Sequence, residues 1–218
     1  MVDKCRDYHT INPHPHVRNQ GPAPTCWAYA AVGLLEAALS LHTGENHDCL
    51  LSVQQIITRT PDSQNGSSVQ AALSQVIKDG GIQMYEEFDP HEQTDVDLHG
   101  NRVSRIHKVA VIRVLDSRET SIPRFLRNFG PIAVLIKSDS LIGYQGGIIS
   151  RVQLPDTTLA NHWVLLVDMT ESYWLFRNSY GDDWGERGYF RVANRFMEEN
   201  VEEFFLAATH VMFEVELQ

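Results

Sequence analysis

The sequence predicts one globular α+β unit with helices in its first half and strands in its second. Apolar residues recur at helical spacing before about residue 80, and short apolar runs parted by Gly, Pro and Asp follow from about residue 105. No internal repeat, low-complexity tract or Gly/Ser linker divides the two halves. We therefore expect a helical lobe over residues 7–108 and a β-rich lobe over 109–218, packed together as a single unit around a shared cleft.

The helical lobe is predicted to contain three helices. The longest covers residues 25–42, where apolar positions keep helical spacing and no Pro interrupts them. A second helix is expected over residues 52–58. A third is expected over residues 67–78, ended by Gly80 and Gly81.

The β-rich lobe is predicted to contain five strands. Each is a run of β-branched, apolar or aromatic residues bounded by turn-forming residues. They are expected over residues 109–115, 132–136, 163–168, 173–177 and 189–192.

Charge and hydropathy argue against two classes of partner. The chain has 18 Lys and Arg against 28 Asp and Glu, and its net charge of -10 repels phosphate backbones and anionic lipid surfaces. No run approaches the roughly 20 apolar residues that a membrane span needs, and residues 1–14 are too polar for a signal peptide. We expect no nucleic-acid partner, no membrane partner and no cofactor.

Cysteine usage favours a reducing compartment. Cys5, Cys26 and Cys49 are too few for a disulfide framework, and an odd count leaves at least one free thiol. We predict that Cys5 and Cys49 are free thiols, so every cysteine should be alkylated in the unreduced, denatured protein. A single alkylated cysteine would show that these two pair.

Cys26 and His162 are the first candidates for chemistry. Taken alone, a cysteine is more typical of a small buried apolar residue, and a histidine at a strand end of a hydrogen-bonded structural residue. Cys26, however, begins the first predicted helix, whose free N–H groups and positive dipole end favour a thiolate. His162 opens the apolar stretch 163–167, so a buried strand end would hold it rigidly as a base.

A turn-rich segment over residues 177–189 supplies a third candidate. Taken alone, it is a long hairpin loop. The side-chain oxygen of Asn178 could instead accept a hydrogen bond from an imidazole N–H and fix its tautomer. Tyr180 or Trp184 would then cover that bond from water, which strengthens it.

Four short blocks follow one another in a known order. They are Val17-Arg18-Asn19-Gln20-Gly21, Cys26-Trp27-Ala28-Tyr29, Asn161-His162 and Asn178-Ser179. This order resembles the papain and cathepsin family of cysteine peptidases. His162 follows Cys26 by 136 residues and Asn178 follows it by 152, close to the about 130–150 residues typical of that family. The resemblance extends from about Asp7 to Val192.

The resemblance implies a papain-like two-lobed fold, in which the helical lobe packs against an antiparallel, β-barrel-like lobe and the active site lies in the cleft. It implies that Cys26 is the nucleophile and His162 its base. Asn178 would orient the base, and Gln20 with the Cys26 backbone N–H would form the oxyanion hole. The implied activity is hydrolysis of peptide or isopeptide bonds. The implied partners are a protein or peptide substrate and a proteinaceous inhibitor, with no metal.

The resemblance also implies which residues contact the substrate. They are Asn65, Gly66, Ser67, Val69, Leu135, Asn161, Trp163 and Trp184. Trp163 stands where relatives carry a small residue in the main specificity pocket, so we expect that pocket to be reduced. Pro24 and Ser67 stand where relatives carry Gly in the substrate wall.

Two departures from the family bear on location. Every disulfide familiar in secreted relatives is missing, which favours a cytoplasmic protein. Asp7 and Tyr8 match the start of the mature relatives. Either the chain is trimmed, in which case a secreted or vacuolar protein is expected, or the natural protein is made without a pro-segment.

Two alternatives stay open. The substitutions around the cleft are also compatible with a papain-fold binding or regulatory protein that has little or no turnover. A metal site at His14 and His16 is the other alternative, but two histidines without carboxylate or Cys partners make a weak site.

Overall fold

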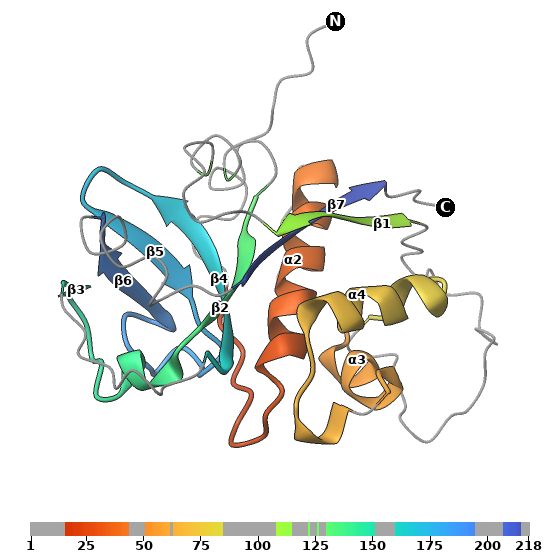
Figure 1. Cartoon of the computed structure of the whole chain (residues 1–218), viewed down its shortest axis with the longest axis horizontal. Helices are drawn as coiled ribbons and strands as arrows, with labels where there is room; N and C mark the ends of the chain where they lie inside the picture. Colours follow the sequence, from red (N-terminus) through yellow and green to blue (C-terminus); the bar gives the residue numbers. More distant parts are fainter. Residues whose placement is uncertain are drawn as a thin grey trace, which may run out of the picture.

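The computed structural model has the α+β architecture that the sequence predicts (Figure 1). It describes residues 16–43, 51–61, 63–84, 108–114, 122, 126, 130–150, 160–194 and 207–214. Within these ranges, the helices α2, α3 and α4 end by residue 78 and the strands begin at residue 108, while short 3-10 helices cover Ser63–Asn65 and Ser138–Leu141. The division of the chain at residue 108 stays a prediction.

Helix α2 (Cys26–Thr43) is the centre of the molecule and confirms the longest predicted helix. Figure 1 shows it between helices α3 and α4 on one side and strands β4, β5 and β6 on the other. Most of its side chains are buried, including Trp27, Ala31 and Leu35. None of the helices in the described ranges is long and apolar enough to cross a membrane. Helix α2 is apolar because it packs against α3 and α4 on one side and against strands of the sheet on the other.

Helices α3 (Val53–Arg59) and α4 (Val69–Lys78) begin where serines cap them. The side chains of Ser52 and Ser68 each accept the backbone N–H of the third residue beyond them, at 3.1 Å. Each helix therefore starts one or two residues later than predicted, because the serines are caps. The glycine pair at 80–81 ends α4 as predicted, through two backbone hydrogen bonds to its last turn.

The strands form one sheet in the order β1-β7-β2-β4-β5-β6-β3. All neighbours are antiparallel except β3 and β6. The strands are β1 (Lys108–Val114), β2 (Ile132–Ile136), β3 (Ile148–Ile149), β4 (His162–Met169), β5 (Tyr173–Arg177), β6 (Tyr189–Ala193) and β7 (Ala207–Glu214). The five predicted strands agree with this to within one residue at each end; Leu115 lies outside the described residues.

Two strands were not predicted from the sequence. β3 has two residues, too few to produce an alternating pattern. β7 begins with two alanines, which are not typical of strands, and no turn residue precedes them directly. Their omission left the sheet two strands short without moving the candidate site.

Strand β4 is buried on both faces and separates two apolar cores. Trp163 and Leu165 point toward the cluster built around α2, whereas Val164 and Leu166 point into the cluster inside the β-rich lobe. The residue at the start of this strand is therefore held by packing on both sides.

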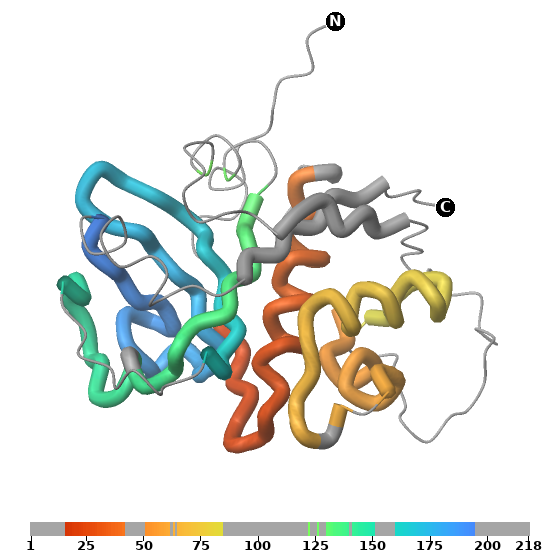
Figure 2. The backbone as a smooth tube through the Cα atoms, viewed as in Figure 1, coloured from red at the N-terminus to blue at the C-terminus, as the bar shows by residue number. Residues whose placement is uncertain are grey.

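The segment before α2, residues 16–25, crosses from one lobe to the other. Figure 2 shows it in red, between the sheet and helices α3 and α4. Asn19 and Tyr180 form an isolated antiparallel bridge. The N–H of Gly181 donates to the carbonyl of Arg18 at 3.2 Å. These contacts tie the segment to the loop that follows β5.

Gly188 makes the tightest contact of this crossing segment. Its φ is +85°, and a Cβ built there would lie 2.5 Å from the Cβ of Val17. We predict that Gly188→Ala lowers the free energy of unfolding by about 2–4 kcal/mol, from left-handed strain and overpacking together. Urea unfolding measures this. Gly80→Ala is the matched control, because its φ is +75° with nothing within 4 Å. Equal losses in both variants would contradict the role of the Val17 contact.

Candidate active site

Cys26 is the first residue of α2, and Thr25 directly precedes the helix. The carbonyl of Thr25 accepts the N–H groups of Ala28 at 2.9 Å and Tyr29 at 3.3 Å. Cys26 is buried, and its thiol is free. Because a residue in the first helical turn has no acceptor within the helix, the Cys26 backbone N–H is available beside its own sulfur.

His162 and Asn178 come from neighbouring strands and are joined by a buried hydrogen bond. His162 opens β4, and Asn178 directly follows β5. The distance between His162 Nε2 and Asn178 Oδ1 is 2.7 Å. The backbone N–H of Ser179 donates to the same Oδ1 at 2.8 Å, which identifies this atom as the oxygen. Nε2 therefore carries the hydrogen, and Nδ1 of the neutral ring is left as an acceptor.

Tyr180 covers this pair. Its ring stacks on His162 with centroids 4.9 Å apart and planes 25° apart. Trp184 packs edge-on against Tyr180 at 5.4 Å. Of the two aromatic residues that the sequence offered, Tyr180 contacts the imidazole and Trp184 supports Tyr180. The stacked ring limits the access of water to the His162–Asn178 hydrogen bond.

Burial is the largest influence on the protonation of both reactive groups. It raises the pKa of the Cys26 thiol, while the backbone N–H groups of Trp163, Trp27 and Cys26 oppose that effect. It lowers the pKa of His162 below its ordinary 6.5, against the opposing effect of the Asn178 hydrogen bond. Burial therefore acts against the thiolate that the N-terminus of α2 favours, and the thiolate stays a prediction. That prediction left out desolvation, which favours a neutral thiol beside a neutral imidazole.

Cys26 at the start of α2, His162 at the start of β4 and Tyr180 in the loop after β5 lie close together. Since the backbone N–H of Trp163 acts on the Cys26 thiol, the sulfur lies next to the start of β4, where His162 is. The ring of Tyr180, stacked on His162, is also close enough to Cys26 for the two to interact electrostatically. A neutral base with a free Nδ1 near a thiol can take up the thiol proton.

Gln20 is anchored to the loop that carries Asn178. Its backbone N–H donates to the Ser179 carbonyl at 2.9 Å, and its Oε1 accepts from Ser179 Oγ at 2.6 Å. Its Nε2 donates to the carbonyl of Ala23 at 2.9 Å. A carboxamide nitrogen carries two hydrogens, so the second can donate to a substrate oxygen.

Ser179 is the functional residue that sequence reasoning missed. It holds the orienting Asn178 through its backbone and Gln20 through its hydroxyl. Its position directly after Asn178 is the one signal for it in the sequence. The contact with Gln20 depends on the segment before α2 reaching this loop, which local pattern does not predict.

Residues 65–67 lie beside the turn that precedes Cys26. Gly66 has a φ of +98°, and a Cβ there would lie 3.7 Å from the carbonyl oxygen of Pro24. Asn65 is exposed, and Ser67 is half-buried. The backbone of the predicted substrate wall therefore lies close to the turn that leads into Cys26.

Trp163 fills the space between the two lobes next to Cys26. It pairs with Leu135 across β2 and β4, so both side chains lie on the same face of the sheet. It is 6% exposed and belongs to one apolar cluster with Cys26 and Val69, against which Leu135 packs. The structure thus brings together the three residues that the sequence assigned to a reduced pocket.

The side chain of Asn161, another predicted contact residue, is held by a hydrogen bond within the β-rich lobe. Its side-chain oxygen accepts the backbone N–H of Ser138 at 2.9 Å, which ties that oxygen to the β-rich lobe. Within the described ranges, no three His, Cys, Asp or Glu side chains gather as a metal site would need. His14, Cys5 and Cys49 lie outside those ranges.

Several viral proteins are similar in sequence to this chain. The viral cathepsin of Adoxophyes honmai nucleopolyhedrovirus is 36% identical over 196 residues, covering 85% of this chain and 56% of the relative. That of Choristoneura fumiferana nuclear polyhedrosis virus is 32% identical over 193 residues, covering 85% and 58%. The chain thus spans just over half the length of these relatives.

Solved structures share the fold. A digestive procathepsin L2 proteinase from the Tenebrio molitor larval midgut superposes with a TM-score of 0.75 at 26% identity, covering 95% of this chain and 67% of that one. The bromelain protease from Ananas comosus, in complex with the E64 inhibitor, gives a TM-score of 0.75 at 23% identity and covers 96% and 98%. The family described as papain family cysteine protease matches residues 4–209. This chain belongs to the papain family of cysteine proteases, and the predicted papain-like α+β fold is confirmed.

Proposed function

We propose that this chain is an endopeptidase that hydrolyses peptide bonds through Cys26, His162 and Asn178. The observation that carries the proposal is the buried hydrogen bond of 2.7 Å between His162 Nε2 and Asn178 Oδ1. It leaves Nδ1 of a neutral imidazole free to act as a base. A structural histidine would not need an oriented amide, a stacked aromatic ring and a neighbouring free thiol together.

The first half-reaction forms an acyl-enzyme. His162 Nδ1 takes the thiol proton while the Cys26 sulfur forms a bond to the substrate carbonyl carbon. The resulting oxyanion accepts hydrogen bonds from the Cys26 backbone N–H and Gln20 Nε2. The imidazolium then gives its proton to the leaving nitrogen as the C–N bond breaks, which leaves a thioester on Cys26 and releases an amine.

The second half-reaction restores the enzyme. His162 takes a proton from water, whose oxygen attacks the thioester carbonyl. The C–S bond breaks, the sulfur regains its proton from His162, and a carboxylic acid leaves. An isopeptide bond is the same amide chemistry on a lysine side chain, so these groups serve both substrates.

Trapping the acyl-enzyme tests the proposed activity. An activated ester substrate should give a burst of product and an acyl mass on the peptide that contains Cys26. Loss of the adduct in His162→Ala would support the role of the base. A slow, burst-free reaction with no adduct would instead favour a papain-fold binding or regulatory protein.

The lowered pKa of His162 determines where activity falls off at low pH. Burial lowers the pKa of His162, so the imidazole stays neutral and able to accept a proton at pH values where a free histidine is charged. We predict that the acid limb of kcat/KM has its midpoint below pH 6.5. A profile of kcat/KM with a peptide that has no titrating groups measures this. A midpoint at or above 6.5 would contradict a buried, neutral base.

Substrate size is expected to be limited beside Trp163. The indole belongs to the same apolar cluster as Val69 and Cys26, and Leu135 packs against that cluster. We propose that the substrate residue pointing toward this cluster, the second before the scissile bond, is Gly or a small apolar residue. A protein or peptide substrate is the expected partner and a proteinaceous inhibitor a further candidate, while the cytoplasmic location stays a prediction.

A further inference from the structure

A small cavity lies between α2 and the ends of β4 and β5, next to Asn178. Its volume is about 20 Å³, and its lining includes Asn178 and Ser179 from the candidate site, Arg18, and Tyr29, Ala30 and Glu36 from α2. A space of at least about 10–15 Å³ can hold one water molecule if polar partners surround it. The cavity is large enough and polar enough for that.

Asn178 brings an unsatisfied donor to this place. Its Oδ1 accepts from His162 and Ser179, but its Nδ2 has no hydrogen-bond partner among the described residues. Asn178 is 6% exposed. A buried donor without an acceptor costs about 1–3 kcal/mol and is rare in folded proteins. In the described part of the chain, the residue proposed to orient the base thus has a buried donor with no acceptor.

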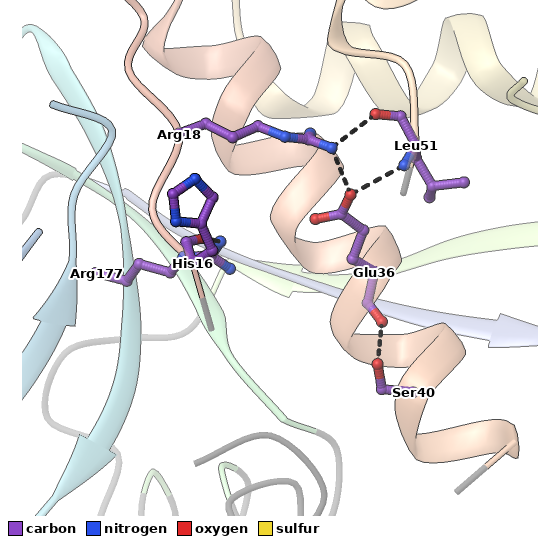
Figure 3. Close-up of polar contacts among 6 residues, drawn as sticks. All are labelled: His16, Arg18, Glu36, Ser40, Leu51 and Arg177. Carbon is purple, nitrogen blue, oxygen red and sulfur yellow. Dashed lines mark hydrogen bonds and ion pairs between the residues drawn. The ribbon is translucent and has the colours of Figure 1, made fainter. Parts of the chain in front are cut away.

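Glu36 brings a buried carboxylate to the same cavity. It is 3% exposed, and its Oε1 accepts from Arg18 Nη2 at 2.9 Å and from the backbone N–H of Leu51 at 3.0 Å (Figure 3). Arg18 Nη2 also donates to the Leu51 carbonyl at 3.0 Å. These bonds fix the carboxylate on α2, where it can accept a hydrogen bond from a molecule in the cavity.

We propose that one ordered water molecule occupies this cavity, accepts a hydrogen bond from Asn178 Nδ2 and donates one to the Glu36 carboxylate. Water suits the site because it can accept and donate at once, as an amide N–H on one side and a carboxylate on the other require. Glu36 is then a positioning residue, which acts on the catalytic base through the water and Asn178. This catalytic consequence rests on the proposed function, whereas the water does not.

The proposed water explains why the side-chain amide of Asn178 does not rotate into the flipped orientation. If the amide rotated by half a turn, Nδ2 would face His162 Nε2–H, and two donors would oppose each other. The Ser179 N–H holds the oxygen end in place. The water holds the nitrogen end, so the two contacts together specify the orientation that His162 needs.

A high-resolution crystal structure of the Cys26→Ala variant tests the water without turnover. We expect a water oxygen about 2.7–3.2 Å from both Asn178 Nδ2 and a Glu36 carboxylate oxygen. A dry cavity would overturn the proposal, and so would a halide with an anomalous signal, since an anion cannot donate to the carboxylate. Because this arm needs no activity, its result is independent of the proposed function.

The variant Ala30→Val tests the positioning role. Ala30 is buried and lines the cavity, so the added methyl groups should displace the water and leave every polar group in place. We expect kcat to fall about two- to tenfold with KM unchanged, the size of one net hydrogen bond. Ala37→Val is the matched control, since Ala37 is buried on the same helix and is not part of the cavity lining.

The two variants distinguish positioning from general destabilisation. Both should lose some thermal stability from overpacking, but only Ala30→Val should lose kcat. Equal kcat values in the two variants would overturn the positioning role. If Ala30→Val does not fold, the crystal structure of the Cys26→Ala protein still decides whether the water is present.

Discussion

Replacing Cys26 with Ala is expected to abolish peptide hydrolysis, with kcat/KM falling by at least about 10⁴-fold, as when the nucleophile of another acyl-transfer triad is removed. The remaining His162, Asn178 and Gln20 cannot form the acyl-enzyme without the sulfur. Hydrolysis of a peptide substrate, followed by mass spectrometry of the products, measures the loss.

The fold should survive this substitution. Ala has the highest helix propensity, and Cys26 occupies the first turn of α2. The melting temperature should therefore stay within a few degrees of the wild type. Cys49→Ala is the matched control and should keep full activity. An undiminished rate in a pure Cys26→Ala preparation would contradict the assignment of the nucleophile.

Replacing Trp163 with Ala is expected to change substrate preference by about ten- to a hundredfold toward Phe at the second residue before the scissile bond. Overfilling a packed space costs about 1–3 kcal/mol, and each factor of ten corresponds to about 1.4 kcal/mol. The wild type should prefer Gly or small apolar residues, because the buried indole shares one apolar cluster with Val69 and Cys26, against which Leu135 packs. A peptide library varied at that one position gives the preference of both proteins.

Stability must be separated from specificity in this experiment. Removing a buried aromatic side chain costs about 3–5 kcal/mol of stability, so the quantity to compare is the ratio of Phe to Gly cleavage within each protein. Trp174→Ala is the matched control, because Trp174 is equally buried but belongs to the core inside the β-rich lobe. Its ratio should not change. A wild type that already prefers Phe or Leu would contradict the filled pocket.

Much of the fold could be predicted because its elements are locally determined. The spacing of Trp27, Ala31 and Leu34 predicted α2, and the run after His162 predicted β4. Caps moved the helix starts by one or two residues, since a serine beside a helix looks like its first residue. β3 and β7 exist through pairing with distant strands, which a local pattern does not contain.

The sequence predicted which residues form the candidate site but not how burial affects their pKa values. Order and spacing identified Cys26, His162 and Asn178, and the structure joins the last two directly. The sequence analysis left out the burial that raises the pKa of Cys26, because that burial comes from packing between segments far apart in the chain. The contact of Ser179 with Gln20 and the proposed role of Glu36 depend on contacts between distant segments, which a local sequence pattern does not contain.

Covalent labelling of Cys26 tests the central claim most directly. An epoxide-type thiol inhibitor is added to the native protein at neutral pH, and the labelled residue is mapped by mass spectrometry of peptides. We expect one adduct, on Cys26, and a labelling rate that drops strongly in His162→Ala. Unlabelled Cys26 in the folded wild-type protein, or labelling that is equally fast without His162, would show that this thiol is not activated and would contradict the proposed peptidase.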